Sequence, residues 1–352
     1  MNGNAKDIDA YWQYIRGICI ICVILIHCKT GVGYENNLIG SWNFDYWLIF
    51  RQFINFPVAV FIFLAGYFTN IGKAEQSYIT YISNRGERLL VSFLIWSAFY
   101  TLINIIVSNG DVNLLKTLAK LLLGLSSAPL YFIVVLLQLT VLTPVLIRSI
   151  QADRGTKFLF LVTPIYFLIL YSYCVIYKTQ MPFYQTFFPG WFIFYYFGLW
   201  IKIRGYEPIF RRNQLINSIL CCLIGLVFSI IEAYWLISIG FPVGFACSQI
   251  KISSFFYAFT IINLLMVTKP HIDNKEITWL RLIGDNSFGI YYVHMFWIMI
   301  SNKLLSSIVL LGDILPIYQI VQLVFTLLFS CISIFIIKKI IGEKVSRRLL
   351  GF

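Results

Sequence analysis

Two charged or titratable side chains, Arg16 and His27, lie within the first strongly apolar stretch of the chain, residues 11–28. On an α-helix a spacing of eleven residues leaves an angular offset of about 20° and an axial separation of about 16 Å. Both side chains therefore point the same way from one helix, about half a bilayer apart. Ionisable groups inside a membrane helix usually face the protein interior and mark a pathway or a site. An imidazole exchanges protons near neutral pH, so His27 is a candidate proton-transfer group, with Arg16 as an anion site. For Arg16 alone, a snorkelling anchor is the alternative.

A second pair of guanidinium groups, Arg85 and Arg88, is expected on the loop that opens the third apolar segment. Residues three apart share one face of a helix, and planar guanidinium forks match phosphate oxygens. The pair is therefore a candidate phosphate clamp. Ordinary cytoplasmic positive charge is the alternative for this loop.

Polar side chains also enter the ninth apolar segment, at Ser287, Tyr291 and His294. Their spacing places them on one stripe of a helix, and a polar stripe in lipid must face protein or water. Tyr291 and His294 are candidate catalytic residues. A seam of hydrogen bonds between helices is the alternative explanation.

Glu232 is the carboxylate that lies well inside an apolar segment, at a depth similar to that of His27. Two roles remain open for it. It orients the imidazole of His27, as carboxylates do in catalytic triads, or it pairs with Arg51 or Lys251 for structural reasons.

The composition indicates an integral membrane protein, since 59% of the 352 residues are hydrophobic and 12% are charged. We expect an all-α membrane protein, a single integral-membrane domain over residues 1–352 with a bundle of about ten transmembrane helices. The predicted spans are 11–29, 46–70, 88–108, 129–150, 157–177, 187–203, 214–239, 253–268, 284–302 and 316–341, with interruptions near Pro57, Pro129, Pro144 and Pro189. Placing both termini in the cytoplasm puts most of the 27 Lys and Arg residues on the inner side, as the positive-inside rule requires.

This charge asymmetry accounts for the net charge of +12 without a nucleic-acid partner. The eight cysteines lie mostly in apolar runs, which is typical of packing residues. We therefore expect no disulfide framework and no metal site.

Four segments of the chain together resemble the acyltransferase-3 family of multi-span membrane O-acyltransferases. The matching segments, in family order, are Arg16-x10-His27, the second-span run from Val58 to Phe68, Arg85-x-x-Arg88, and Ser287-Phe-Gly-Ile-Tyr-Tyr-Val-His294. Ala65 stands where the family usually has Ser before Gly66. Because the chain stops at Phe352, it resembles the stand-alone members that lack an appended esterase-like domain.

The resemblance implies a multi-pass protein of the bacterial inner membrane. Acetyl-CoA or another short acyl-CoA is the implied cosubstrate, with no permanently bound cofactor. The implied acceptor is a hydroxyl of a surface polysaccharide or of its lipid-linked precursor. Arg85 and Arg88 would hold the CoA phosphates, the thioester arm would pass Arg16, and His27 would act as general base or as transient acyl carrier. Oligomeric state is left open.

A glycolipid or polysaccharide flippase is the competing class, because it also needs many spans and charges within the membrane. Such transporters often contain two related halves, and no such internal symmetry is visible here. A non-catalytic scaffold in a glycan-assembly complex is the remaining alternative.

Overall fold

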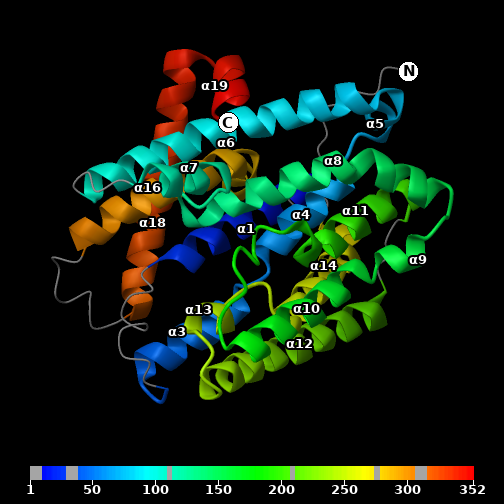
Figure 1. Cartoon of the computed structure of the whole chain (residues 1–352), viewed down its shortest axis with the longest axis horizontal. Helices are drawn as coiled ribbons and strands as arrows, with labels where there is room; N and C mark the ends of the chain where they lie inside the picture. The colour runs from blue at the N-terminus through cyan, green and yellow to red at the C-terminus, as the bar shows by residue number, and fades with distance from the viewer. Residues whose placement is uncertain (1–9, 29–38, 109–112, 207–210, 273–277, 306–314) are drawn as a thin grey trace. The chain divides into compact units, whose positions relative to one another are not determined.

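The computed structural model describes residues 10–28, 39–108, 113–206, 211–272, 278–305 and 315–352, and these residues form helices joined by turns and short loops (Figure 1). Within these ranges no β-strand occurs, which confirms the all-α prediction. The chain divides into two compact units: one contains residues 1–61 and 207–334, the other residues 62–206 and 335–352. Helices α4 (Pro57–Tyr67) and α18 (Leu315–Ile341) each contribute residues to both units.

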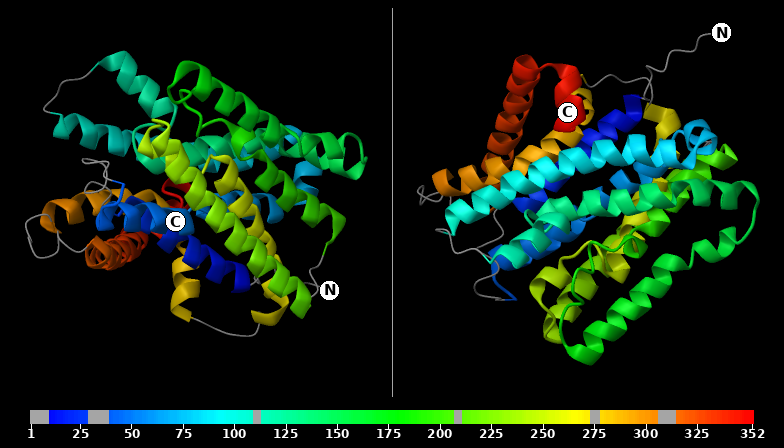
Figure 2. Two further views of the ribbon diagram at one scale, coloured as in Figure 1. Left: turned by 90° about the horizontal axis from the view of Figure 1, so that it is seen from below. Right: turned by 45° about the horizontal axis from the view of Figure 1, so that its top comes forward.

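The first unit is built from long apolar helices and two short ones. Its helices are α1 (Ala10–His27), α3 (Trp42–Phe53), α12 (Arg212–Ser238), α13 (Val243–Ala246), α14 (Ile252–Ile272), α15 (Thr278–Asp285), α16 (Ser287–Leu305) and most of α18. Helices α12 and α14 pack along each other, and α1 packs against α15 and α16. The antiparallel pair α12–α14 can be followed in Figures 1 and 2.

The second unit is arranged around α6, which packs against α8 and α19. Its elements are α5 (Ile71–Gln76), α6 (Tyr78–Val107), α7 (Leu114–Leu122), η1 (Ala128–Leu130), α8 (Tyr131–Gln151), α9 (Thr156–Leu159), α10 (Val162–Tyr177), η2 (Phe188–Gly190), α11 (Phe192–Arg204) and α19 (Glu343–Leu349). Ser77 caps α6 by accepting a hydrogen bond from the backbone N–H of Thr80 at 3.3 Å.

Eight helical segments in the described residues are long and apolar enough to cross a membrane, and they coincide with eight of the ten predicted spans. The other two predicted spans correspond to α11, which has 13 residues, and to α16, a 19-residue helix with several polar side chains. The count of ten and the side on which the termini lie stay predictions.

Two details differ from the sequence-based expectation. The segment with Arg85 and Arg88 is not a loop, because α6 already begins at Tyr78, one residue after its Ser77 cap. Pro144 lies inside the continuous helix α8 rather than at an interruption. Membrane helices tolerate such a proline because neighbouring polar groups and local adjustments satisfy the freed carbonyl. The expected break before Pro57 is present, between α3 and α4.

Candidate active site

Helix α1 carries both Arg16 and His27, and its neighbours in the first unit determine what surrounds each of them. Near Arg16 the α1 backbone approaches α15 so closely that a Cβ atom on Gly17 would lie 2.5 Å from the carbonyl oxygen of Leu280. The Arg16 Nη1 atom lies 3.4 Å from the Gln13 side-chain oxygen. The exposed carboxylate of Asp285, at the end of α15, attracts the Arg16 guanidinium. Asp285 is a neighbour of Arg16 that the sequence analysis did not identify.

At the other end of α1, His27 lies beside His294 of α16. Their ring centroids are 5.6 Å apart and the ring planes are inclined by 43°. His27 is partly exposed, whereas His294 is fully buried. The structure thus brings together two of the predicted catalytic side chains from helices that are more than 250 residues apart in the chain.

The polar stripe predicted on α16 is buried along its length. Ser287, Tyr291 and His294 are all at most 6% exposed. The Tyr291 ring lies 6.0 Å from the His294 ring, measured between centroids. The His294 Nδ1 atom lies 3.1 Å from the Ile290 carbonyl oxygen, while Nε2 is buried without a hydrogen-bond partner among the described residues.

Arg51, near the end of α3, is a further cation beside this histidine pair. Its Nη1 donates a hydrogen bond of 3.1 Å to the carbonyl oxygen of Ile26, the residue next to His27. From the sequence, Arg51 was expected only as a possible partner for Glu232. A contact between a side chain in the second apolar segment and a backbone carbonyl in the first leaves no sequence pattern from which it could have been found.

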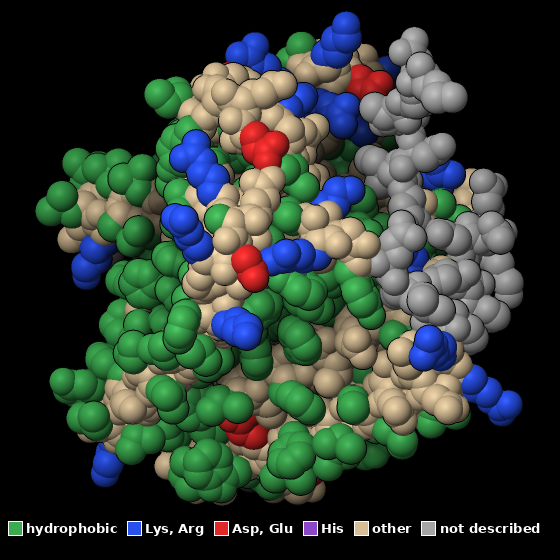
Figure 3. Space-filling view, turned by 90° about the vertical axis from the view of Figure 1, so that its right-hand side faces the viewer, with side chains coloured by type: hydrophobic (Ala, Val, Ile, Leu, Met, Phe, Trp, Pro, Cys, Tyr) green, Lys and Arg blue, Asp and Glu red, His purple; other side chains and the backbone are tan. Residues whose placement is uncertain are grey.

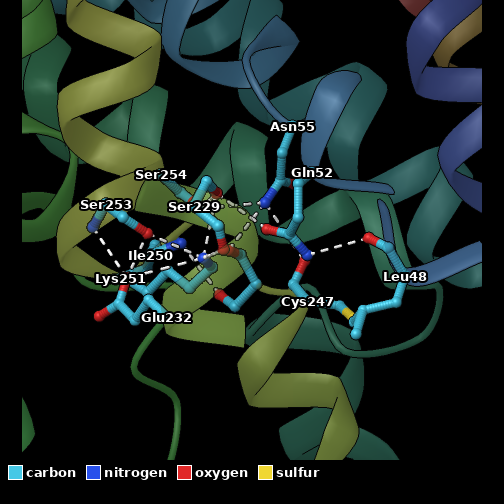
Figure 4. Close-up of polar contacts among 11 residues, drawn as sticks. Leu48, Gln52, Asn55, Ser229, Glu232, Cys247, Ile250, Lys251, Ser253 and Ser254 are labelled. Atoms are coloured by element: carbon cyan, nitrogen blue, oxygen red, sulfur yellow. Dashed lines mark hydrogen bonds and ion pairs between the residues drawn. The ribbon is translucent and has the colours of Figure 1, made fainter. Parts of the chain in front are cut away.

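Glu232 pairs with Lys251, which is one of the two structural partners left open for it (Figure 4). The Lys251 Nζ atom lies 3.6 Å from the Glu232 carboxylate and also donates to the Ser229 carbonyl at 2.7 Å. Lys251 is fully buried. Glu232 also accepts from the backbone N–H of Ser253 at 2.9 Å and from the Ser253 hydroxyl. Its role in orienting His27 stays a prediction.

The Lys251–Glu232 pair belongs to a larger polar network that joins α12 and α14 to the break between α3 and α4 (Figure 4). The Ser229 hydroxyl donates to the Gln52 side-chain oxygen at 2.9 Å. The Asn55 amide nitrogen lies 2.9 Å from the Ser248 carbonyl and 3.1 Å from the Ser254 hydroxyl. The network therefore fastens the end of α3 next to Arg51.

Arg85 and Arg88 belong to the second unit, and the structure gives them different surroundings. The Arg85 guanidinium donates to the Tyr81 hydroxyl at 2.6 Å, the Thr69 hydroxyl at 3.1 Å and the Ala65 carbonyl at 3.1 Å. Arg88 is exposed. Figure 3 shows one face of the molecule, on which Lys and Arg side chains lie among hydrophobic ones.

The glycines of the second-span motif serve close helix packing. A Cβ atom on Gly66 would collide with the carbonyl oxygen of Tyr195 on α11, and one on Gly198 would collide with that of Phe63 on α4. The two helices therefore cross through paired glycines, a small-residue contact typical of membrane helices. Gly66 is explained by packing, whatever chemistry its neighbours perform.

These features define a class of protein. Helices long enough to span a membrane hold a pair of neighbouring imidazoles, and within the described ranges no group of three His, Cys, Asp or Glu side chains gathers as a metal site would require. A family model described as an acyltransferase domain matches residues 9–337 and so includes residues of both units. The chain belongs to the acyltransferase-3 family, and the protein is a membrane acyltransferase. No curated protein and no solved structure matches it.

Proposed function

We propose that this protein moves an acetyl or other short acyl group from cytoplasmic acyl-CoA to a hydroxyl of a surface polysaccharide or of its lipid-linked precursor. The observation that carries the proposal is the pairing of His27, which lies on the same helix as Arg16, with His294 of α16; their ring centroids are 5.6 Å apart. An imidazole that acts as general base on a hydroxyl must be within reach of the substrate. His27 meets this condition because it is partly exposed.

Each of the candidate residues has a separate role in this reaction. His27 takes the proton of the acceptor hydroxyl or carries the acyl group transiently. Arg16, which lies beside Gln13 and is attracted by Asp285, binds an anionic part of the donor. Arg88, exposed on α6, binds CoA phosphate, while Arg85 supports that end of α6 through its bonds to Thr69 and Ala65.

A bacterial inner membrane is the compartment that suits this reaction, because the donor is cytosolic and the acceptor is exported. Tyr291 lies beside the imidazole pair and is a candidate for stabilising the oxyanion of the tetrahedral intermediate. Glu232 acts on the site through the network that fastens α3, whether or not it also orients His27.

The test uses membrane vesicles that contain the full chain, with acetyl-CoA labelled in the acetyl group as probe. Wild-type vesicles should transfer label to a glycan fraction and release free CoA, and mass spectrometry of that fraction should show the acetyl increment. His27→Ala should abolish transfer while the protein accumulates normally. His271→Ala is the matched control, because it removes the third histidine of the chain and should leave transfer unchanged.

A flippase would leave acetyl-CoA intact while glycolipid crosses the membrane. Acetyl-CoA that stays intact in wild-type vesicles would therefore contradict the proposal, and so would a His27→Ala variant that transfers label as fast as wild type. Replacing acetyl-CoA by propionyl-CoA or longer thioesters in the same assay defines the acyl length that the site accepts.

A further inference from the structure

The hydrogen bond at Nδ1 determines the tautomer of His294. Its partner, the Ile290 carbonyl oxygen at 3.1 Å, is only an acceptor, so Nδ1 carries the ring proton. The other nitrogen, Nε2, therefore presents a lone pair in the neutral imidazole. The Ile290 carbonyl, one helical turn before His294, thus orients the His294 imidazole as a base.

The Nε2 lone pair of His294 has no hydrogen-bond donor among the described residues, although the side chain is fully buried. Leaving a buried acceptor unsatisfied costs about 1–3 kcal/mol, and unpaired groups of this kind often belong to a catalytic site. The nearest titratable ring is His27, whose centroid lies 5.6 Å away. At that distance, two ring nitrogens that face each other need only a small approach of the rings to come within hydrogen-bond reach.

Arg51 disfavours the protonated, positively charged form of His27. Its guanidinium is bonded to the Ile26 carbonyl, one residue from His27, so an imidazolium at His27 would face a like charge. His294, in contrast, lies beside the Tyr291 ring and is hydrogen-bonded to the Ile290 carbonyl oxygen. A proton acquired by His27 is therefore better placed on His294.

We propose that His294 is the proton acceptor of His27: its Nε2 takes the ring proton of His27 during acyl transfer. This inference rests on the proposed function. When His27 is the general base, its unprotonated ring nitrogen takes the hydroxyl proton. At the same time the proton on its other ring nitrogen passes to Nε2 of His294. The hydroxyl oxygen bonds to the thioester carbon, the C–S bond breaks, and the proton held by His294 returns through His27 to the departing thiolate.

The same relay serves an acyl-carrier role of His27. The bare nitrogen then bonds to the thioester carbon, the C–S bond breaks, and the His27 N–H proton passes through His294 to the thiolate. The acceptor hydroxyl later attacks the acyl carbon, the C–N bond breaks, and the hydroxyl proton remains on His27. In both cases His27 stays neutral and the transient positive charge lies on His294.

The first experiment is independent of any donor or acceptor. The chain has three histidines, so 15N-histidine NMR of the full-length protein in nanodiscs gives few ring signals, and single His→Gln variants assign them. We expect His294 to carry its proton on Nδ1 with Nε2 bare, and its Nε2 signal to shift in His27→Gln. His271→Gln is the control and should leave that signal in place. A proton on Nε2, or no response to His27→Gln, overturns the relay.

The second experiment compares two conservative variants in the labelled acetyl-CoA assay. His294→Asn can keep the bond to Ile290 but has nothing at the Nε2 position, whereas His294→Gln places a hydrogen-bonding amide there that cannot take up a proton. Both should lower kcat about 100-fold or more, with an unchanged KM for acetyl-CoA. If His294→Gln retains activity within about threefold of wild type, His294 only holds a hydrogen bond and the proposal is wrong. If wild type consumes no acetyl-CoA, the proposed function fails, while the NMR result still decides whether Nε2 of His294 is the unprotonated nitrogen that interacts with His27.

Discussion

Gly284 of α15 lies directly against the backbone of Gln13 on α1, so that a Cβ atom on residue 284 would collide with the Gln13 carbonyl oxygen. The same crossing includes Gly17, whose Cβ would meet Leu280. This contact places the start of α16 beside the N-terminal part of α1, and the two helices meet again at the His27–His294 pair. These two contacts along α1 thereby place Arg16 near Asp285 and His27 beside His294.

Gly284→Ala should destabilise the protein, because a backbone carbonyl cannot move aside as a flexible side chain would. We expect a loss of about 1–3 kcal/mol, measured as a lower melting temperature of the purified protein in detergent. Gly72→Ala on α5 is the control, since the nearest atom to its added Cβ is 3.9 Å away. An unchanged melting temperature for Gly284→Ala would contradict the close crossing.

Arg85 and Arg88 should separate into a structural and a binding residue. Arg85→Ala removes a guanidinium that bonds to Tyr81, Thr69 and Ala65, so we expect a stability loss of about 2–3 kcal/mol even without donor. Arg88→Ala should leave the melting temperature unchanged and raise the KM for acetyl-CoA. Thermal unfolding and donor kinetics on the same two preparations check this, and equal effects of both variants on both quantities would refute it.

Removing one partner of the Lys251–Glu232 pair should destabilise the protein more than replacing both partners. Lys251→Met leaves the Glu232 carboxylate without its cation and should destabilise the protein by about 3–5 kcal/mol. Lys251→Met combined with Glu232→Leu should recover much of that loss, because no unpaired charge remains. Urea or thermal unfolding of the two variants measures the difference. Acetyl transfer retained by a folded double variant would also exclude orientation of His27 by Glu232.

The C-terminal residues should hold α19 against α6. The Trp96 indole N–H donates to the Leu350 carbonyl at 3.1 Å, and the Phe352 ring lies 6.1 Å from the Trp96 ring. Removing residues 350–352 should expose α19 to trypsin, which cleaves after Lys and Arg side chains such as Arg347. Trp96→Phe keeps an aromatic ring but loses the hydrogen bond, so it should loosen α19 by only about 1 kcal/mol. Equal cleavage rates in wild type and truncated protein would disprove this docking.

The sequence determined the features that depend on spacing along a single helix. Hydropathy located the apolar segments, and the helical repeat placed Arg16 with His27 on α1 and Tyr291 with His294 on α16. It could not show that α6 already begins at Tyr78, because the charges of residues 85–88 hide a helix that continues beyond the apolar segment.

Only the tertiary structure decided which helices meet. It paired His27 with His294, gave Glu232 to Lys251, brought Arg51 to the end of α1 and turned Arg85 towards Ala65. Each contact joins residues that no local repeat relates. Such contacts follow from the packing of whole helix surfaces, with glycines at the closest crossings, and helical periodicity alone predicts only the face on which each residue lies.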